Sequence, residues 1–326
     1  MRYYDVFNGD ADGICALHQL RLEQPVESTL VTGLKREIAL LEAVEAGPGD
    51  IVTVLDLSME RNRPALRRLL ARGVLVRYFD HHDPGDIPDH AGLVAVIDPS
   101  GNACTSVIVD GVLHGRFRPW AVVGAFGDNQ PDTAAGLAHT LGLDARQIAT
   151  LRELGEDLNY NAYGQSESDV MMPPADLYRI VRRHASPFDL AAREAVVHRL
   201  KEERESDLAK ASEVSPAHSG AGADAWVLPD ATWSRRVSGT FANRLALDDP
   251  QRAHAVLTPI AGDDAYVLSV RSPRGEAMHA SDFCRRFGAG GGRARAAGVD
   301  RLPRAELSHL FDALDQAWGA PSQSLG

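Results

Sequence analysis

Long apolar runs, cysteines and an excess of basic residues are what this sequence has little of. No apolar run approaches the ~20 residues of a membrane-spanning helix, and residues 1–5 lack the apolar core of a signal peptide. The three cysteines, Cys15, Cys104 and Cys284, are an odd number without metal-site spacing, which argues against a disulfide framework. We therefore expect a soluble, reduced protein of the cytoplasm that binds no membrane.

Basic residues are outnumbered by acidic ones. Lys and Arg total 34, and Asp and Glu total 45, so the formal net charge is −11. A protein that binds long nucleic acid by neutralising its phosphates needs the opposite balance. Short nucleotides stay open as ligands, because metal ions held by acidic residues reverse the local field.

The length and the apolar pattern predict an α/β protein of two domains. At 326 residues the chain is about twice the usual length of a single domain. In the first half, helical patterns such as residues 37–45 alternate with short β-branched runs, which is typical of a parallel sheet with helices on both faces. The predicted strands are residues 3–7, 29–32, 51–55, 74–79 and 93–97.

The second half begins with a long charged helix, predicted over residues 187–211. Residues 212–224 have the Pro, Gly and Ser content of a linker, and a smaller mixed α/β domain follows. The predicted domains are therefore residues 1–186 and 225–318, with 187–224 connecting them and 319–326 as a disordered tail.

Four groups of acidic residues or histidines follow predicted strands or lie in loops of the first domain. They are the Asp10 and Asp12 pair, Asp56, the Asp80-His81-His82 triplet and Asp128. Each alone has a structural interpretation, as a turn, a helix N-cap or a polar loop. Parallel strands would bring three of the groups to one sheet edge, where ligands gather. Four Asp and one His then form an oxygen–nitrogen set suited to a pair of divalent ions, Mn²⁺ above all.

The order of these groups resembles the DHH phosphoesterase superfamily, named for the Asp80-His81-His82 triplet. Asp-x-Asp-Gly at residues 10–13 is followed by Asp56, then by the triplet, then by a Gly-Asp pair that ends at Asp128. The resemblance extends to residues 98–106 and, in the second domain, to residues 269–272 and the glycine motif 290–298. It covers nearly the whole chain and is nearest to RecJ, oligoribonucleases and dinucleotide phosphodiesterases.

The resemblance implies a catalytic metal-binding domain and a DHH-associated substrate-binding domain, with the active site in the cleft between them. The implied ligands of two Mn²⁺ ions, with Mg²⁺ as the alternative metal, are Asp10, Asp12, Asp56, His81 and Asp128. Asp56 would bridge the ions, and Asp80 would accept a ring N–H from a neighbouring histidine. His82 would face the substrate phosphate, as a donor or as the acid for the leaving oxygen.

The sequence departs from the family at two places. Val6 stands where many relatives carry a histidine, and the nearby Asn8 offers only an amide oxygen as a weak ligand. Arg293 replaces the usual histidine of the glycine motif but keeps a positive charge and a bidentate fork for phosphate. We interpret the glycines as a phosphate cradle that starts a helix. The residues expected to bind substrate are Asn8, Arg271, Gly291, Gly292, Arg293 and Arg295.

The resemblance and the acidic charge together predict a metal-dependent phosphodiesterase, exonuclease-like, that hydrolyses short oligonucleotides or linear dinucleotides with a metal-activated water. Two other functions stay open. One is a nucleotide-binding regulatory module without turnover, and the other is a phosphatase or pyrophosphatase acting on a small phosphorylated metabolite. A homodimer is compatible with each of them.

Residues 158–164 form a polar–aromatic patch with two tyrosines. One interpretation is a wall of the site on which a base stacks. We favour the other, a loop packed against the first domain, because tyrosines are often half-buried. The remaining histidines, His18, His184 and His279 among them, are interpreted as structural.

Overall fold

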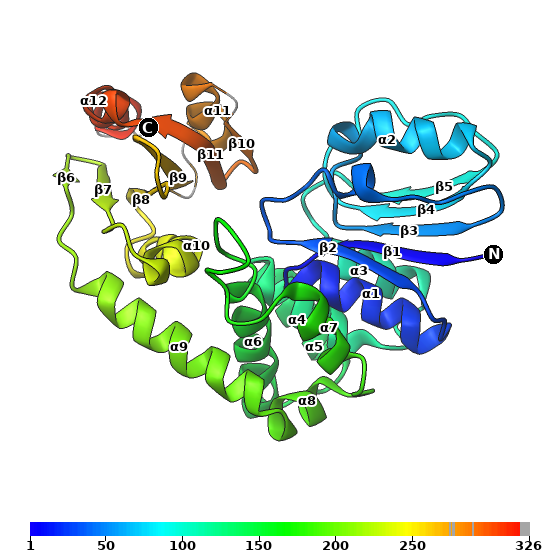
Figure 1. Ribbon diagram of the computed structural model, residues 1–326. Coiled ribbons are helices and arrows are strands. Elements are labelled where there is room, and N and C mark those ends of the chain that lie inside the picture. The colour runs from blue at the N-terminus through cyan, green and yellow to red at the C-terminus, as the bar shows by residue number, and fades with distance from the viewer. Residues whose placement is uncertain (274, 276–277, 289, 320–326) are drawn as a thin grey trace, which may run out of the picture. The chain divides into compact units, whose positions relative to one another are not determined.

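The computed structural model describes residues 1–273, 275, 278–288 and 290–319, and the chain divides into two compact units (Figure 1). The first unit is Met1–Glu202, and the second begins at Glu203. The division falls inside the segment 187–224 that we predict to connect two domains. Of the predicted disordered tail, residues 320–326 lie outside the described residues.

The first unit is built on a five-stranded sheet in which each strand runs parallel to its neighbours. The strand order is β2-β1-β3-β4-β5. The strands are β1 (Tyr3–Asn8), β2 (Thr29–Gly33), β3 (Ile51–Leu55), β4 (Leu75–Asp80) and β5 (Leu93–Ile97). The predicted parallel sheet is confirmed, and each strand end lies within one residue of its predicted place.

Helices cover both faces of this sheet. The helices that begin in the first unit are α1 (Ala11–Glu23), α2 (Met59–Ala71), α3 (Thr105–Val112), α4 (Arg118–Gly127), α5 (Pro131–Thr140), α6 (Ala145–Tyr160), α7 (Pro174–Val181), α8 (Pro187–Arg193) and α9 (Ala195–Ser212), the last of which continues into the second unit. Helix α2 lies on one face of the sheet and α1 on the other (Figure 1). Val6 and Val54 are in register on β1 and β3 and share a core with α2, whereas the next residues, Phe7 and Leu55, share a core with α1. Because both faces are covered, most residues of the strands are apolar.

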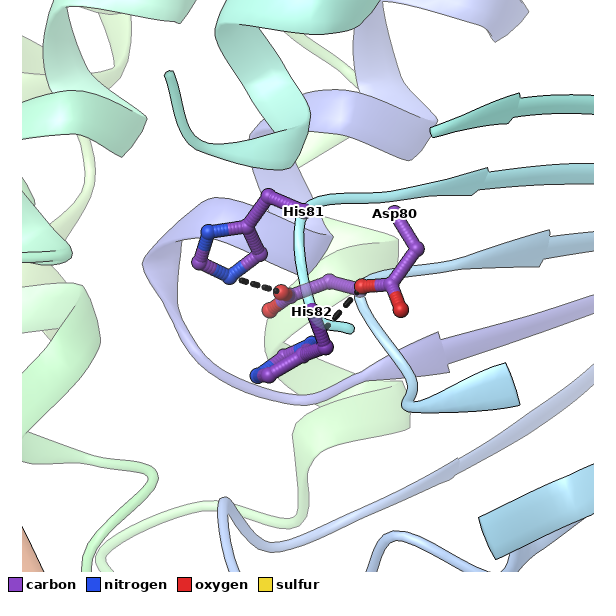
Figure 2. Close-up of side chains that lie close together, drawn as sticks. Asp80, His81 and His82 are labelled. Atoms are coloured by element: carbon purple, nitrogen blue, oxygen red, sulfur yellow. Dashed lines mark hydrogen bonds and ion pairs between the residues drawn. The ribbon is translucent and has the colours of Figure 1, made fainter. Parts of the chain in front are cut away.

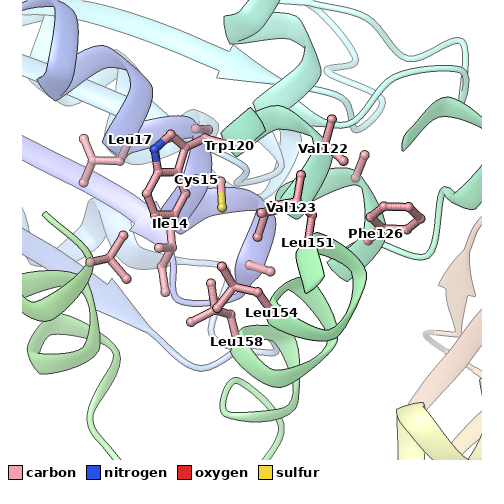
Figure 3. Close-up of a cluster of buried hydrophobic side chains, with 14 of the residues drawn as sticks. Ile14, Cys15, Leu17, Trp120, Val122, Val123, Phe126, Leu151, Leu154 and Leu158 are labelled. Atoms are coloured by element: carbon pink, nitrogen blue, oxygen red, sulfur yellow. The ribbon is translucent and has the colours of Figure 1, made fainter. Parts of the chain in front are cut away.

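The face opposite α2 holds the larger core, formed by α1, α4 and α6 (Figure 3). Trp120 of α4 is 1% exposed, and its indole N–H donates to the carbonyl oxygen of Ala185 at 3.0 Å. Leu154 and Leu158 of α6 are as deeply buried. This core fixes the N-terminus of α1 and the C-terminus of α4, which are the two helix ends that carry candidate metal ligands.

Two predicted helices differ from the structure. Residues 37–45 hold only a 3₁₀ turn, Leu40–Ala43, because the Asn62 side chain pairs with backbone groups there: it accepts from Leu41 N and donates to the carbonyl oxygen of Ile38. Residues 187–211 form two helices, because Glu194 between α8 and α9 is extended and pairs with His184 at 2.7 Å.

The second unit contains a six-stranded mixed sheet with the order β10-β11-β9-β8-β7-β6. Only β7 and β8 are parallel neighbours among the strands described. The strands are β6 (His218–Ser219), β7 (Ala223–Val227), β8 (Ala253–Pro259), β9 (Ala265–Arg271), β10 (Gly291–Gly292) and β11 (Ala296–Pro303). The predicted linker 212–224 therefore contains β6 and the start of β7.

Two separate apolar clusters flank this second sheet. Helix α10 (Thr232–Asp248) packs on one side, and α11 (Ala280–Cys284) and α12 (Leu307–Trp318) contribute to the other cluster. The predicted fold class, a parallel α/β unit followed by a mixed α/β unit, is confirmed. Within the described ranges no helix is both long and apolar enough to span a bilayer.

Candidate functional site

The carboxyl ends of three neighbouring strands carry the acidic groups. Asp10 lies two residues beyond β1, Asp56 directly follows β3, and Asp80 is the last residue of β4. Since β3 lies between β1 and β4, the parallel strands bring all three carboxylates to one edge of the sheet. Asp12 and Asp128 reach this edge from the start of α1 and the end of α4.

The turn from β1 into α1 is fixed by side chains that pair with backbone. Asp10 Oδ1 accepts from the backbone N–H of Asp12 at 3.0 Å and of Gly13 at 3.1 Å, which caps the helix. A Cβ at Gly13 would lie 2.1 Å from the carbonyl oxygen of Asn8, so only glycine fits. The Asn8 amide accepts from Asp10 N and donates to the Lys35 carbonyl. Asn8 therefore holds two loops of the site together.

Asp12 is fixed by the first turn of α3. Its two carboxylate oxygens accept from the backbone N–H groups of Thr105 at 2.7 Å and Ser106 at 2.8 Å. The positive end of a helix stabilises such a buried carboxylate. The Thr105 hydroxyl also donates to Asp56 Oδ1 at 3.3 Å. The segment 98–106 noted in the sequence thus positions two of the acidic residues.

Asp56 occupies a strained and crowded position. Its backbone is left-handed, with φ 57°, a conformation that Asp tolerates better than most residues. The side chain is buried, and Oδ1 lies 3.2 Å from His81 Nε2. Burial first, and then the charges of Asp10 and Asp12, raise the pKa of Asp56 well above its usual range. A cation bound beside Asp56 would stabilise its ionised carboxylate.

The Asp80-His81-His82 triplet continues β4 into the site (Figure 2). Asp80 Oδ1 lies 2.7 Å from His82 Nδ1, and because a carboxylate only accepts, Nδ1 donates. Partial burial lowers the pKa of His82, but the Asp80 hydrogen bond and charge outweigh it and raise the pKa. The His82 side chain is 44% exposed, whereas that of His81 is 3% exposed. His81 is thus the buried ring and His82 the accessible one.

Two sets of side chains fit a divalent ion. Their ligand atoms lie within 4.8 Å of one another, and the sets are Asp56, Asp80, His81 and His82, and Asp12, His81 and Asp128. Asp80 Oδ2 is buried and has no hydrogen-bond partner in the part of the chain that the structure describes. An unpaired buried acceptor is costly, and a bound cation would satisfy it. Carboxylate oxygens and imidazole nitrogens are the donor set that suits Mn²⁺.

Lys35 is the site residue that sequence reasoning missed. It follows β2, the fourth strand whose carboxyl end lies at this edge, and its ammonium contacts the Asp10 carboxylate. Its Nζ also lies 3.4 Å from Asn159 Oδ1 and 3.9 Å from Asp128 Oδ1. Burial lowers the pKa of Lys35, but the charges of Asp10, Asp128 and other acidic groups around it together outweigh burial and raise the pKa, so the side chain is a cation. The available signal was its place just past a strand of the sheet.

The polar–aromatic patch 158–164 is divided between core and site. Tyr160 is fully buried and belongs to the core of the first unit, as the favoured interpretation expects. Asn159 and Tyr163 instead face Lys35, whose Nζ lies 5.9 Å from the centre of the Tyr163 ring. Neither of the two interpretations of the patch describes all of it.

Arg271, one of the expected substrate residues of the second unit, is anchored through its guanidinium. It ends β9, and its Nε donates to Asn243 Oδ1 at 2.7 Å, while Nη2 donates to the Gly239 carbonyl at 3.4 Å. Both partners lie on α10. These contacts fix the direction of the guanidinium.

The glycine motif forms a β-hairpin, and the prediction that it starts a helix is wrong. Gly291 and Gly292 make up β10, which pairs with β11, because the following residues extend the sheet beside β9. A Cβ at Gly292, whose φ is 138°, would lie 2.5 Å from Ala297 Cα. Arg293 follows directly, half-buried, and Arg295 is exposed. The two arginines lie in the turn of this hairpin.

Solved structures share this architecture, although the sequence matches no protein-family model and no curated protein. Manganese-bound RecJ exonuclease is 18% identical, with a TM-score of 0.58 over 97% of this chain and 89% of its own. RecJ from Thermus thermophilus in complex with Mn²⁺ is also 18% identical, with a TM-score of 0.59 over 97% of this chain, which spans 51% of that longer protein. The pGpG-specific phosphodiesterase PggH from Vibrio cholerae is 15% identical, with a TM-score of 0.54 over 97% of this chain and 98% of its own.

These neighbours share the fold across both units of the chain. The resemblance to the DHH phosphoesterases, RecJ-like members included, is thereby confirmed at the level of the fold. Both RecJ structures contain manganese.

Proposed function

We propose that this chain is a divalent-metal-dependent phosphodiesterase of the DHH superfamily that hydrolyses short oligonucleotides or linear dinucleotides. The observation that carries the proposal is the buried edge of the first sheet. There Asp56 and His81 lie 3.2 Å apart and Asp80 Oδ2 has no hydrogen-bond partner among the described residues. The fold shared with an exonuclease and a dinucleotide phosphodiesterase supports the same reaction class.

The metal would be held by the residues that the resemblance implies: Asp10, Asp12, Asp56, His81 and Asp128. Bound divalent ions lower the pKa of a ligand water and stabilise the charge that develops on a phosphoryl group. The protein contributes a rigid set of oxygens, since backbone N–H groups hold Asp12 and the left-handed turn aims Asp56. Mn²⁺ fits the mixture of donors, and Mg²⁺ is the alternative.

Asp80 and His82 would act on the phosphate. Asp80 accepts from His82 Nδ1 and raises the pKa of the ring, so that His82 holds a proton more firmly than a free histidine. A protonated, accessible ring can donate to a phosphate oxygen or protonate the leaving oxygen. The roles of the two histidines would then differ, with His81 at the metal and His82 at the substrate.

The second unit would bind the remaining phosphate charge. Arg271 is already oriented by Asn243, and Arg293 and Arg295 lie in the turn of the glycine hairpin. Arginine suits phosphate because its fork donates two parallel hydrogen bonds. The net charge of −11 favours a short substrate, because a long strand would meet acidic surface outside these few arginines.

A panel of substrates offered with Mn²⁺ tests the proposal. It sets a linear dinucleotide, a five-nucleotide RNA, single-stranded DNA, pyrophosphate and a nucleoside 3′,5′-bisphosphate side by side, with His81→Gln as the inactive control. We expect the dinucleotide and the short RNA to be hydrolysed fastest, and His81→Gln to be inactive on both. Fastest release from pyrophosphate or the bisphosphate would identify a small-molecule phosphatase. Nucleotide binding without turnover in Mn²⁺ and in Mg²⁺ would identify a regulatory module.

A further inference from the structure

Both carboxylate oxygens of Asp10 already have partners. Its Oδ1 accepts from two backbone N–H groups, those of Asp12 and Gly13, and caps α1. Its Oδ2 contacts the ammonium of Lys35. The residue is 1% exposed, so solvent does not take the place of these partners. A divalent ion at Oδ2 would meet the positive charge of Lys35 at contact distance, and that repulsion opposes binding while the ammonium stays.

The ammonium of Lys35 lies among the groups that would otherwise bind a cation. It contacts Asp10, and its Nζ is 3.4 Å from Asn159 Oδ1 and 3.9 Å from Asp128 Oδ1. Two carboxylates and one amide oxygen around a single positive charge are the surroundings of a small bound ion. The Tyr163 ring, 5.9 Å away, adds a cation–π contact.

The two sets of side chains that fit a divalent ion leave Asp10 out. One set is centred on Asp56 and the triplet, and the other on Asp12 and Asp128, with His81 in both. The resemblance, however, counts Asp10 among the ligands of two ions. The first set therefore fits an ion beside Asp56 without change, whereas the second set shares Asp128 with Lys35, whose ammonium already lies between Asp128 and Asp10.

The choice of lysine supports this interpretation. Only three of the 34 basic residues of the sequence are lysines, Lys35, Lys201 and Lys210, and the rest are arginines. A compact ammonium on a flexible stem can fill an ion-sized position and swing away from it, whereas a guanidinium is a broad planar fork. The basic residue that contacts Asp10 and lies near Asp128 is a lysine, whose ammonium is close in size and charge to a small bound cation.

We infer that Lys35 occupies the second cation position of the centre, so that one divalent ion binds tightly and a second binds only by displacing the ammonium. This inference rests on the proposed metal site and deepens it. Its consequence is a centre that holds one ion tightly and a second ion weakly. Lys35 is a positioning residue in this account, because it acts on Asp10 and Asp128.

The test compares Mn²⁺ binding to the full chain and to Lys35→Met, which keeps the length of the side chain and removes its charge. Lys35→Arg keeps the charge, and Lys201→Met is the matched control, because Lys201 pairs with the exposed Glu153 at 3.1 Å. Isothermal titration gives the first and second dissociation constants. Electron paramagnetic resonance reports the spin coupling of two Mn²⁺ ions held ~3.5–4 Å apart. Circular dichroism checks that each variant is folded.

In the wild type and in Lys201→Met we expect one tight ion and a second at least about a hundredfold weaker, as a unit charge at ion-pair distance from two carboxylates implies. In Lys35→Met the second ion binds about a hundredfold more tightly and the coupled spectrum appears at low Mn²⁺. Lys35→Arg should keep the binding of the second ion weak.

An unchanged second dissociation constant in folded Lys35→Met overturns the inference, while binding of the first ion still supports the proposed function. If Lys35→Met is unfolded, a Lys35→Arg protein that binds two ions equally overturns it instead. Absence of any Mn²⁺ binding in the wild type overturns both.

Discussion

Replacing Asp56 by Asn should stabilise the metal-free protein and abolish its response to Mn²⁺. Burial and the neighbouring carboxylates raise the pKa of Asp56 in the folded chain. A raised carboxyl pKa means that the unfolded chain releases the proton first, so at pH above about 4 the ionised group favours unfolding. Asn removes the charge, keeps the size of the side chain, and tolerates the left-handed backbone at this position.

The size of the effect follows from the surroundings of Asp56. Burial is the largest cause of its raised pKa, and the charges of Asp10 and Asp12 add to it. A single like charge at about 5 Å contributes about 3 kcal/mol at an effective dielectric constant of ~20. Asn also weakens the contact with His81, which costs about 1 kcal/mol. The net gain of about 2 kcal/mol would raise Tm by roughly 4–8 °C for a unit of this size.

The assay is thermal unfolding at pH 7.5 in EDTA and in Mn²⁺. Mn²⁺ at 100 times its Kd should stabilise the wild type by about 3 kcal/mol, and Asp56→Asn should lose most of that gain. The control is Asp144→Asn, because Asp144 caps α6 and Asn caps equally well. An Asp56→Asn protein that melts below the wild type in EDTA, or that keeps the full Mn²⁺ shift, would refute the reasoning.

Three further predictions concern the stability of the first unit. Burial, first of all, lowers the pKa of His18 to about 4, so protonation favours the unfolded chain. The free energy of unfolding should therefore fall by roughly 3 kcal/mol as the pH drops from 6.5 to 4. His18→Gln should remove this pH dependence in urea titrations across the same range, and an equal pH dependence in the variant would contradict the prediction. Gly13→Ala should lower the free energy of unfolding by at least about 2 kcal/mol, because the new Cβ would meet the Asn8 carbonyl. Gly136→Ala, in the open middle of α5, should raise it by about 0.5–1 kcal/mol, and urea unfolding measures both. Leu154→Ala should cost about 2–5 kcal/mol at a position 1% exposed, and a loss below about 1 kcal/mol would mean that this core is poorly packed.

The sheet could be predicted because its strands are short apolar runs with polar residues at their ends. Parallel strands that are buried on both faces are continuous apolar runs, without the polar–apolar alternation of a half-buried strand. The apolar run at residues 51–55 therefore coincides with the strand Ile51–Leu55. Because parallel strands share one carboxyl edge, the sequence alone also places Asp10, Asp56 and Asp80 together. Residues that act at the ends of strands are therefore accessible to sequence reasoning.

The rest of the site depends on tertiary contacts that leave no local pattern. Lys35 follows β2 closely enough for its position to be noticed, but only the fold shows that its ammonium reaches Asp10 and Asp128. The helix predicted over residues 37–45 is replaced by one 3₁₀ turn because Asn62, on another helix, pairs with its backbone. The prediction that the glycine motif starts a helix is wrong because glycines precede helices and hairpins alike.

Anomalous diffraction from a crystal soaked in Mn²⁺ shows whether the edge formed by β1, β3 and β4 holds a divalent ion. We expect a peak at the manganese edge within ligand distance of Asp56 and His81 and beside Asp80 Oδ2. In a crystal of Lys35→Met we expect a second peak between Asp10 and Asp128. No peak at this edge, at a Mn²⁺ concentration that supports hydrolysis, would contradict the account.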